Sequence, residues 1–177
     1  MKAITIYQPY ASLIAEGHKI YEPRAFYTKY RGPIAIHSAR VIDPDVFKFM
    51  LCPISTVLEL ERCGVNAYNV DNLSRSTIIA MAELVDIWEV EKSTIGGEIV
   101  LRKLKNTDNL HHCQYRPTAT TITLDRKEAA LGDWHKGTYA WEFRNVKALE
   151  LPIPAKGSPR LWDWDPETES KEDEDNV

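Results

Sequence analysis

The segment GHKIYEPR, residues 17–24, decides how the N-terminal part of this chain folds. It starts with a glycine, which commonly ends a helix, and contains Pro23, which cannot donate a hydrogen bond to a neighbouring strand. The segment is therefore expected to form an edge strand, a bulge or a loop. In a regular strand Glu22 and Arg24 share one face, and Lys19 lies on the other. Lys19 and Glu22 converge only where Pro23 or the turn after the glycine breaks this alternation.

Upstream of this segment the sequence predicts a short strand and a short helix. Residues 3–6 are rich in β-forming side chains. Pro9 is typical of the start of a helix, and Tyr10, Leu13 and Ile14 follow it at helical spacing. A helix of about two turns is not stable on its own, so it must pack against the rest of the domain.

Downstream of the segment, short strands alternate with short helices. The strongest strand signal is the nearly continuous apolar run at residues 76–90. Other strands are expected at residues 34–37, 98–104, 139–143 and 161–162, and helices after Asp43, at 55–63 and at 125–131. This pattern favours an α+β fold, a small mixed β-barrel with short flanking helices, over a doubly wound sheet. No glycine-rich strand-to-helix loop is present, and no cofactor is expected.

The composition is typical of one globular domain, with 44% hydrophobic and 27% charged residues. The charge is unevenly distributed. From Asp163 onward there are eight acidic residues and one basic residue, so this part carries −7 although the whole chain carries −4. Residues 1–162 therefore carry +3 and are expected to form the domain, with residues 163–177 as an acidic, disordered tail.

The sequence predicts neither a metal site nor a membrane segment. The three cysteines, Cys52, Cys63 and Cys113, lack paired spacing, which favours a reducing cytoplasm over a disulfide framework. His111, His112 and Cys113 are adjacent, but no CxxC or HxxxH pair accompanies them, so no metal is expected there. The apolar runs are too short to cross a bilayer and the first residues are unlike a signal peptide, so a cytoplasmic location is expected.

Five segments carry a family resemblance that covers both ends of the domain: residues 8–14, 17–24, 30–37, 139–141 and 152–157. In this order they resemble the ASCH family, a branch of the PUA-like superfamily, and residues 17–24 are similar to its GxKxxExR signature. The resemblance implies a β-barrel with a cleft floored by the signature segment. It also implies a role in binding RNA or a nucleoside.

The resemblance implies one enzymatic chemistry as well. Small bacterial amidohydrolases of the family deacetylate N4-acetylcytidine with a lysine that activates a threonine three residues later and with a distant glutamate. Lys19 matches that lysine, Glu22 occupies the threonine position, and Glu83 and Glu128 are candidates for the distant glutamate. In this chain the reaction would be hydrolysis by water, with Glu22 as general base and Lys19 or Arg24 stabilising the oxyanion.

The residue types also suit recognition of a nucleobase or a phosphate. Glutamine reads donors and acceptors, aromatic rings stack on bases, and arginine binds phosphate as a planar fork. The candidate binding residues are Gln8, Tyr10, Arg24, Arg31, His37 and Trp141. The structural alternatives are that Glu22 forms an ion pair with Arg24 or Arg31, and that His37 is a hydrogen-bonded core histidine.

Three functions are compatible with these features. The first is binding of RNA or a modified nucleoside, and the second is deacylation of a modified cytidine. The third is a protein-interaction module that uses the acidic tail. Aromatic and basic residues also alternate at Tyr27, Lys29, Tyr30 and Arg31, which indicates either a surface for single-stranded nucleic acid or a solvated rim.

Overall fold

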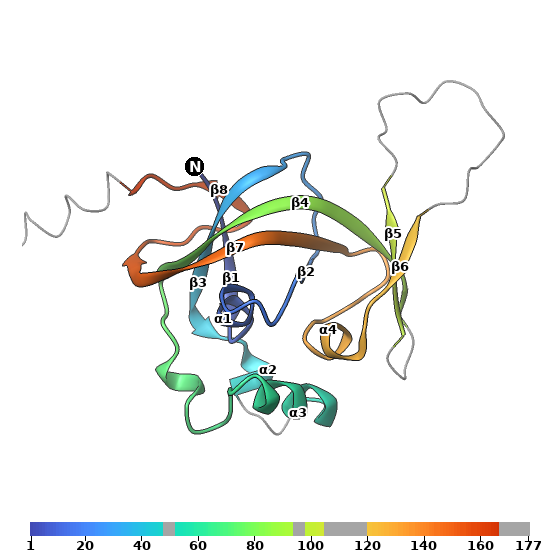
Figure 1. The fold of residues 1–177 in the computed structure, drawn as a ribbon, viewed down its shortest axis with the longest axis horizontal. Helices are drawn as coiled ribbons and strands as arrows, with labels where there is room; N and C mark the ends of the chain where they lie inside the picture. Colours follow the sequence, from blue (N-terminus) through green and yellow to red (C-terminus); the bar gives the residue numbers. More distant parts are fainter. Residues whose placement is uncertain (48–51, 94–97, 105–119, 167–177) are drawn as a thin grey trace, which may run out of the picture.

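The computed structural model describes residues 1–47, 52–93, 98–104 and 120–166. Within these residues eight strands form one sheet, with short helices beside it (Figure 1). The strands are β1 (Lys2–Gln8), β2 (Tyr21–Arg24), β3 (Gly32–Ile42), β4 (Thr77–Ser93), β5 (Ile99–Lys103), β6 (Thr121–Thr123), β7 (Tyr139–Pro154) and β8 (Leu161–Asp163). The helices are α1 (Tyr10–Ala15), α2 (Pro44–Phe47), α3 (Ile54–Arg62), α4 (Arg126–Ala130) and the 3-10 turn η1 (Val70–Asn72). The predicted α+β class is confirmed.

The sheet is mixed and open. Its main path runs β2-β7-β4-β3-β1-β8, and β5 pairs with β4 and with β6. The β1–β3 pair is parallel, whereas the other pairs are antiparallel. Among the described residues the path ends at two very short strands, β2 and β8, which are not paired with each other. The closed barrel expected from the sequence is therefore not confirmed.

The central strands and α1 enclose the main core. Ile4 and Ile6 of β1 are buried with Ala11 and Ile14 of α1, so the short helix is packed on the sheet as its length required. Gly17 follows α1 with a φ of 75°, a left-handed conformation that a glycine adopts without a steric penalty. Its position confirms the predicted end of the helix.

Several strands extend beyond the predicted ranges. β7 continues to Pro154, although its residues after Phe143 are mostly exposed and alternate apolar with polar side chains only in part. Its long antiparallel pairing with β4 satisfies the backbone, and that pairing is invisible in the local sequence. β6 was not predicted, because it follows the irregular stretch 91–117, part of which lies outside the described residues.

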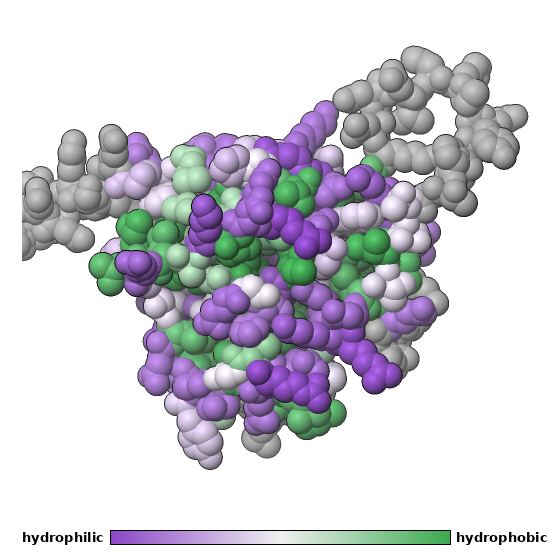
Figure 2. All heavy atoms as spheres, in the orientation of Figure 1, coloured by the Kyte–Doolittle hydropathy of each residue, from purple (hydrophilic) through white to green (hydrophobic). Residues whose placement is uncertain are grey.

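The domain also extends past its predicted end at residue 162. Asp163 pairs with Lys2 in the sheet, and the side chain of Trp164 is buried against Ala3 and Ala35. Asp163 and Trp164, which the sequence assigned to the acidic tail, therefore belong to the folded domain. Residues 167–177 lie outside the described part of the chain. None of the described helices is long and apolar enough to span a membrane. On the face drawn in Figure 2, hydrophilic side chains alternate with small hydrophobic areas.

Candidate functional site

The signature segment brings Lys19 and Glu22 together. β2 begins only at Tyr21, so Lys19 precedes the strand and the two-residue alternation does not apply to it. Lys19 Nζ lies 3.2 Å from Glu22 Oε2 and donates a hydrogen bond to the Tyr21 carbonyl. The lysine side chain is fully buried, with Nζ 5.4 Å from the centre of the Trp134 ring. The turn after Gly17 thus produces the convergence that a regular strand would have prevented.

Glu128 of α4 joins this buried pair. Its Oε1 accepts a hydrogen bond from the Ile20 amide at 2.5 Å, and its Oε2 lies 3.4 Å from the Tyr21 amide. Burial raises the pKa of Glu128 above its ordinary value, and the Lys19 charge partly opposes that rise. Glu83, the other candidate, accepts from the Asn145 side chain at the surface. Of the two candidates for the distant glutamate, only Glu128 is close enough to Lys19 to interact with its charge.

Arg24 extends from the same segment in another direction. Its Nε is 3.8 Å from Glu22 Oε1, and its Nη2 donates to the Thr5 carbonyl. Arg24 Nε is inaccessible to solvent and has no hydrogen-bond partner among the described residues. Burial lowers the pKa of Arg24, and the Glu22 carboxylate only partly opposes this effect. The positive charge of Arg24 is therefore incompletely compensated by the protein.

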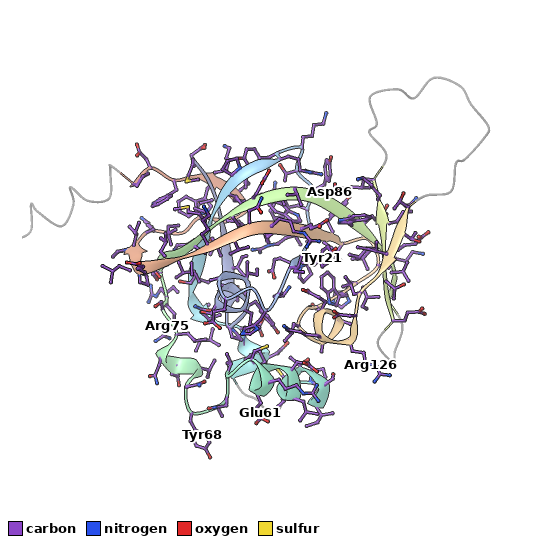
Figure 3. The ribbon with its side chains drawn as sticks, viewed as in Figure 1. Tyr21, Glu61, Tyr68, Arg75, Asp86 and Arg126 are labelled. Atoms are coloured by element: carbon purple, nitrogen blue, oxygen red, sulfur yellow. The ribbon has the colours of Figure 1, made fainter. Side chains whose placement is uncertain are left out.

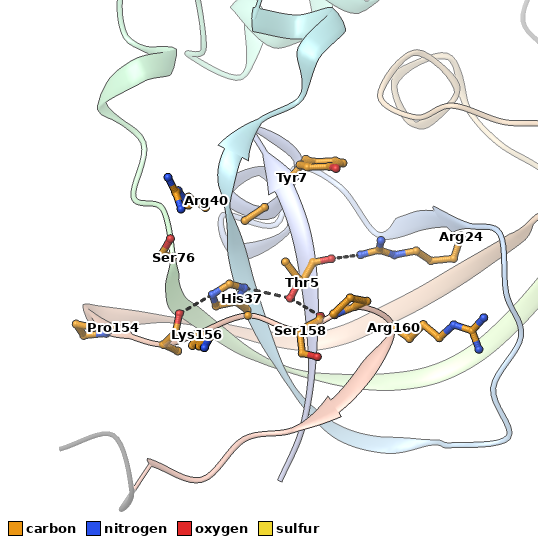
Figure 4. Close-up of a pocket in the computed structure, with 14 residues that line it drawn as sticks. Thr5, Tyr7, Arg24, His37, Arg40, Ser76, Pro154, Lys156, Ser158 and Arg160 are labelled. Atoms are coloured by element: carbon orange, nitrogen blue, oxygen red, sulfur yellow. Dashed lines mark hydrogen bonds between the residues drawn. The ribbon is translucent and has the colours of Figure 1, made fainter. Parts of the chain in front are cut away.

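Arg24 lines a cavity of about 850 Å³ on the side of β1 and β3 opposite the main core (Figure 4). Its walls come from β1, β2, β3, the residue before β4, and residues 154–160 between β7 and β8. The lining residues are Thr5, Tyr7, Arg24, His37, Ala39, Arg40, Ser76, Pro154, Ala155, Lys156, Gly157, Ser158, Pro159 and Arg160.

The alternation of β1 explains why Thr5 and Tyr7 face this cavity. Ile4 and Ile6 point into the main core, so the residues between and after them must point to the other face. The parallel pairing of β1 with β3 places His37 opposite Thr5. The His37 Nδ1 and Thr5 Oγ1 atoms are 3.2 Å apart, as expected for such cross-strand neighbours.

Residues 154–160 form the opposite wall and are held by hydrogen bonds to the strands. His37 Nε2 is 3.0 Å from the Ala155 carbonyl, which can only accept, so this nitrogen carries the proton. Thr5 Oγ1 donates to the Ser158 carbonyl at 3.0 Å. A Cβ on Gly157 would lie 2.3 Å from His37 Cε1, so only glycine permits this close approach. His37 is thus both a hydrogen-bonded structural residue and part of the cavity wall.

The cavity is strongly basic. Its cationic side chains are Arg24, Arg40, Lys156 and Arg160, and no Asp or Glu is among its described lining residues. The last three of these are exposed. Such a concentration of one charge in a concave site attracts an anionic ligand.

Two lining residues have an unusual backbone conformation. Ser76 has a φ of 54° and Arg160 a φ of 62°, in the left-handed region where non-glycine residues are uncommon. Such a conformation persists only where the surrounding structure imposes it. Residues that adopt it are enriched at binding sites. Both lie at the cavity, at its two opposite ends in Figure 4.

Two of the predicted binding residues, Gln8 and Trp141, are buried in the core. Both ends of the Gln8 amide are used, since Nε2 donates to the Ser74 carbonyl at 2.7 Å and Oε1 accepts from the Ser12 amide at 3.1 Å. Trp141 is completely buried, and its Nε1 donates to the Phe26 carbonyl at 3.2 Å. Neither side chain is available to a ligand, so their expected roles in reading and stacking a base are not supported.

Two more predicted residues lie outside the cavity. Tyr10 packs between two core clusters, and burial raises the pKa of its hydroxyl. Arg31 lies in the connection between β2 and β3, where its Nη1 donates to the Tyr30 carbonyl at 2.7 Å. Of the six predicted binding residues, only Arg24 and His37 line the cavity.

Sequence reasoning missed three of the four cations. Lys156 belongs to the segment 152–157, which was quoted for its family resemblance but not for its charge. Arg40 and Arg160 stand in no recognisable pattern, because they reach the site only through the pairing of distant strands. Among the described residues no group of three or more His, Cys, Asp or Glu side chains is placed to hold a metal ion. The segment 111–113 lies outside the described residues.

A family model described as the ASCH domain matches residues 4–153. The chain belongs to the ASCH domain family. This family, with a PUA-like fold, is generally associated with RNA binding. No curated protein matches the sequence. In this ASCH domain the signature lysine and glutamate are buried, and the signature arginine reaches the cavity.

Proposed function

We propose that this ASCH domain binds RNA through the cavity, by contacts of its basic side chains with phosphate and of its other lining residues with a base. The observation that carries the proposal is the collection of Arg24, Arg40, Lys156 and Arg160 around one cavity with no acidic residue in its described lining. Phosphate contacts of this kind supply most of the affinity of proteins for nucleic acid.

Arg24 is the central residue of the proposed site. The Arg24 side chain is 21% exposed, and its nearest carboxylate oxygen, Glu22 Oε1, is 3.8 Å from Nε, so an anion in the cavity would gain a charge-assisted contact with the accessible part of the side chain. Thr5 and Ser76 add hydroxyl groups that can donate or accept. Tyr7 is 48% exposed at the cavity and supplies the stacking face that Trp141 cannot.

Binding is proposed in preference to deacylation because Lys19 and Glu22 are engaged in contacts within the protein. Both side chains are buried, and their charges are directed at each other, at the Tyr21 carbonyl and toward Arg24. The cluster therefore fixes the backbone that presents Arg24, which a binding site requires. A hydrolase would require the general base Glu22 to reach a water and the substrate.

The proposal is tested by measuring the affinity for a fluorescent oligouridylate of about ten nucleotides at several salt concentrations. Arg40→Gln and Arg160→Gln remove exposed cations of the cavity, and Arg126→Gln, on α4 outside the cavity, is the matched control (Figure 3). Each cavity variant is expected to weaken binding and to reduce the slope of log affinity against log salt by about 0.7. Cavity variants that bind like Arg126→Gln would contradict the proposal.

The deacylase alternative is tested in the same preparation with N4-acetylcytidine. The wild-type protein is expected to release no acetate. Release of acetate that is abolished by Glu22→Gln but not by Arg126→Gln would establish the enzyme and overturn this part of the proposal. A protein-interaction role for the acidic tail stays a prediction, since most of that tail lies outside the described residues.

A further inference from the structure

A strip of aromatic and basic side chains begins at one end of the cavity. We call it the aromatic strip and define it as Phe26, Tyr27, Arg31, Tyr139 and Arg160. The connection between β2 and β3 supplies three of these residues, and Tyr139 stands opposite Arg24 in the β2–β7 pair. The cavity and the strip therefore share the end of β2.

Arg160 connects the cavity to the strip. It lines the cavity, and its Cζ lies 5.9 Å from the centre of the Phe26 ring. Figure 4 draws Arg160 and Arg24 at the same end of the cavity, away from Arg40 and Ser76. Tyr27 follows Phe26 directly in the chain, so it is one residue away from the position that Arg160 contacts.

Tyr27 offers an accessible ring at this point. Its side chain is 43% exposed, whereas the neighbouring Phe26 packs edge-on against the buried Trp141 at a centroid distance of 5.2 Å. The Tyr27 ring is 5.7 Å from Tyr139, and the Arg31 guanidinium lies 5.8 Å from its centre. The ring is therefore held in place from two directions while much of it stays exposed.

The connection that carries Tyr27 is ordered by its own hydrogen bonds. Arg31 Nη1 donates to the Thr28 carbonyl at 3.0 Å and to the Tyr30 carbonyl at 2.7 Å. The Tyr30 amide donates to Thr28 Oγ1 at 3.1 Å. A stacking ring on such a pre-organised segment loses little conformational freedom when a base binds.

The charge around the strip suits a polyanion. Asp86 is shared between Arg31, at 3.6 Å, and Lys103, at 3.0 Å, so one carboxylate compensates two cations. Lys29 is exposed on the same connection. Cations beside an exposed aromatic ring are the combination by which proteins hold single-stranded nucleic acid without reading its sequence.

We propose that a single-stranded RNA held in the cavity continues past Arg160 and stacks its next base on Tyr27. This proposal rests on the proposed function, because the cavity supplies the first contact. It adds a second contact that lengthens the binding site, so affinity should depend on the number of nucleotides.

The test compares uridine monophosphate with an oligouridylate of about ten nucleotides. Tyr27→Ser removes the ring, Tyr27→Phe keeps it, and Tyr68→Ser removes a tyrosine that is 95% exposed outside the cavity and the strip (Figure 3). Tyr27→Ser is expected to weaken oligonucleotide binding about tenfold and to leave mononucleotide binding unchanged. Tyr27→Phe and Tyr68→Ser are expected to bind both ligands like the wild type.

The possible results separate the two proposals. If Tyr27→Ser weakens the oligonucleotide no more than Tyr68→Ser does, or if the oligonucleotide binds no more tightly than the mononucleotide, the strip is not an RNA contact. If the strip fails in this way while Arg160→Gln still weakens the mononucleotide, the cavity proposal stands alone. If Arg160→Gln and Arg40→Gln leave the affinity for both ligands unchanged, the proposed function itself fails.

Discussion

At the scale of single residues, the signature segment divides its charged side chains between two tasks. Lys19 and Glu22 are buried with Glu128, where the lysine binds one carbonyl of the segment and Glu128 accepts from two of its amides. Arg24 alone reaches the cavity. In the proposed function the buried residues have an indirect role, because they fix the backbone from which Arg24 extends.

Glu128 provides a pH-dependent test of this arrangement. Because folding raises its pKa, the folded protein holds the Glu128 proton more tightly than the unfolded chain does. The free energy of unfolding of the wild type, relative to Glu128→Gln, should therefore fall as pH rises from the ordinary value of 4.5 to the raised pKa. The fall should be about 1.4 kcal/mol for each unit by which folding raises the pKa.

Urea denaturation of both proteins across this pH range measures the difference. A constant offset is also expected, since a glutamine oxygen can accept from the Ile20 and Tyr21 amides less well than a carboxylate. A wild-type stability that rises relative to Glu128→Gln with increasing pH would show that the ionised carboxylate is favoured by the fold, contrary to this account.

At the scale of elements, the cavity depends on the segment between β7 and β8. Residues 154–160 have no helix or strand of their own after Pro154, and their position is set by bonds to Thr5, His37 and Ser76. The Ala155 amide donates to the Ser76 carbonyl at 3.0 Å. Three separate strands or strand ends therefore hold the segment that presents Lys156 and Arg160.

Gly157→Ala should displace this segment. The added Cβ would meet the His37 ring at 2.3 Å and Thr5 Oγ1 at 3.0 Å, so the chain must move away from β1 and β3. We expect a loss of about 1–3 kcal/mol in the free energy of unfolding, together with weaker RNA binding. Thermal or urea denaturation and the oligonucleotide assay measure the two effects.

A double-mutant cycle with His37→Ala isolates the contact. Removal of the imidazole makes room for the new methyl group, so Gly157→Ala should cost less in the His37→Ala background than in the wild type. Equal costs in the two backgrounds would show that the clash with His37 is not the cause.

At the scale of the whole molecule, the first and last described segments of the chain pair with each other in the sheet. β8 pairs with β1, the Trp164 amide donates to the Met1 carbonyl at 2.7 Å, and the Trp164 side chain is buried in a cluster with Ala3, Ala35 and Ala155. This cluster lies next to the segment that forms the cavity wall, since Ala155 belongs to both. The pairing of β8 with β1 therefore supports the cavity wall.

Trp164→Ala should be strongly destabilising, with a loss of about 3–5 kcal/mol in the free energy of unfolding, because it empties a buried site. Asp163→Asn is the matched contrast. It removes a surface ion pair of 2.9 Å between Lys2 and Asp163 and should cost less than about 1 kcal/mol. Urea denaturation measures both variants, and equal losses would show that Trp164 is not a core residue.

The sequence alone determined the class of the fold and most of its elements. Apolar periodicity predicted the α1 stripe and the long β4 strand. Gly17 predicted the end of α1, and Pro23 left an edge strand among the predicted possibilities, which is the position of β2. These signals are local, since they depend on the conformational limits of a residue and of its near neighbours. Residue chemistry, together with the segments that resemble the family, identified Arg24 and His37 as candidates for the site, and both line the cavity.

Only the tertiary structure decided which side chains meet. Arg24, Arg40 and the pair Lys156 and Arg160 come from three separate segments of the sequence. They surround one cavity because β1 pairs in parallel with β3 and the chain after β7 crosses back over both. The same packing buried Gln8 and Trp141, whose chemistry had suited a base. Which strands pair, and which polar side chains that pairing buries, leaves no pattern in a short stretch of residues, so the tertiary structure and not residue type decided which side chains line the cavity.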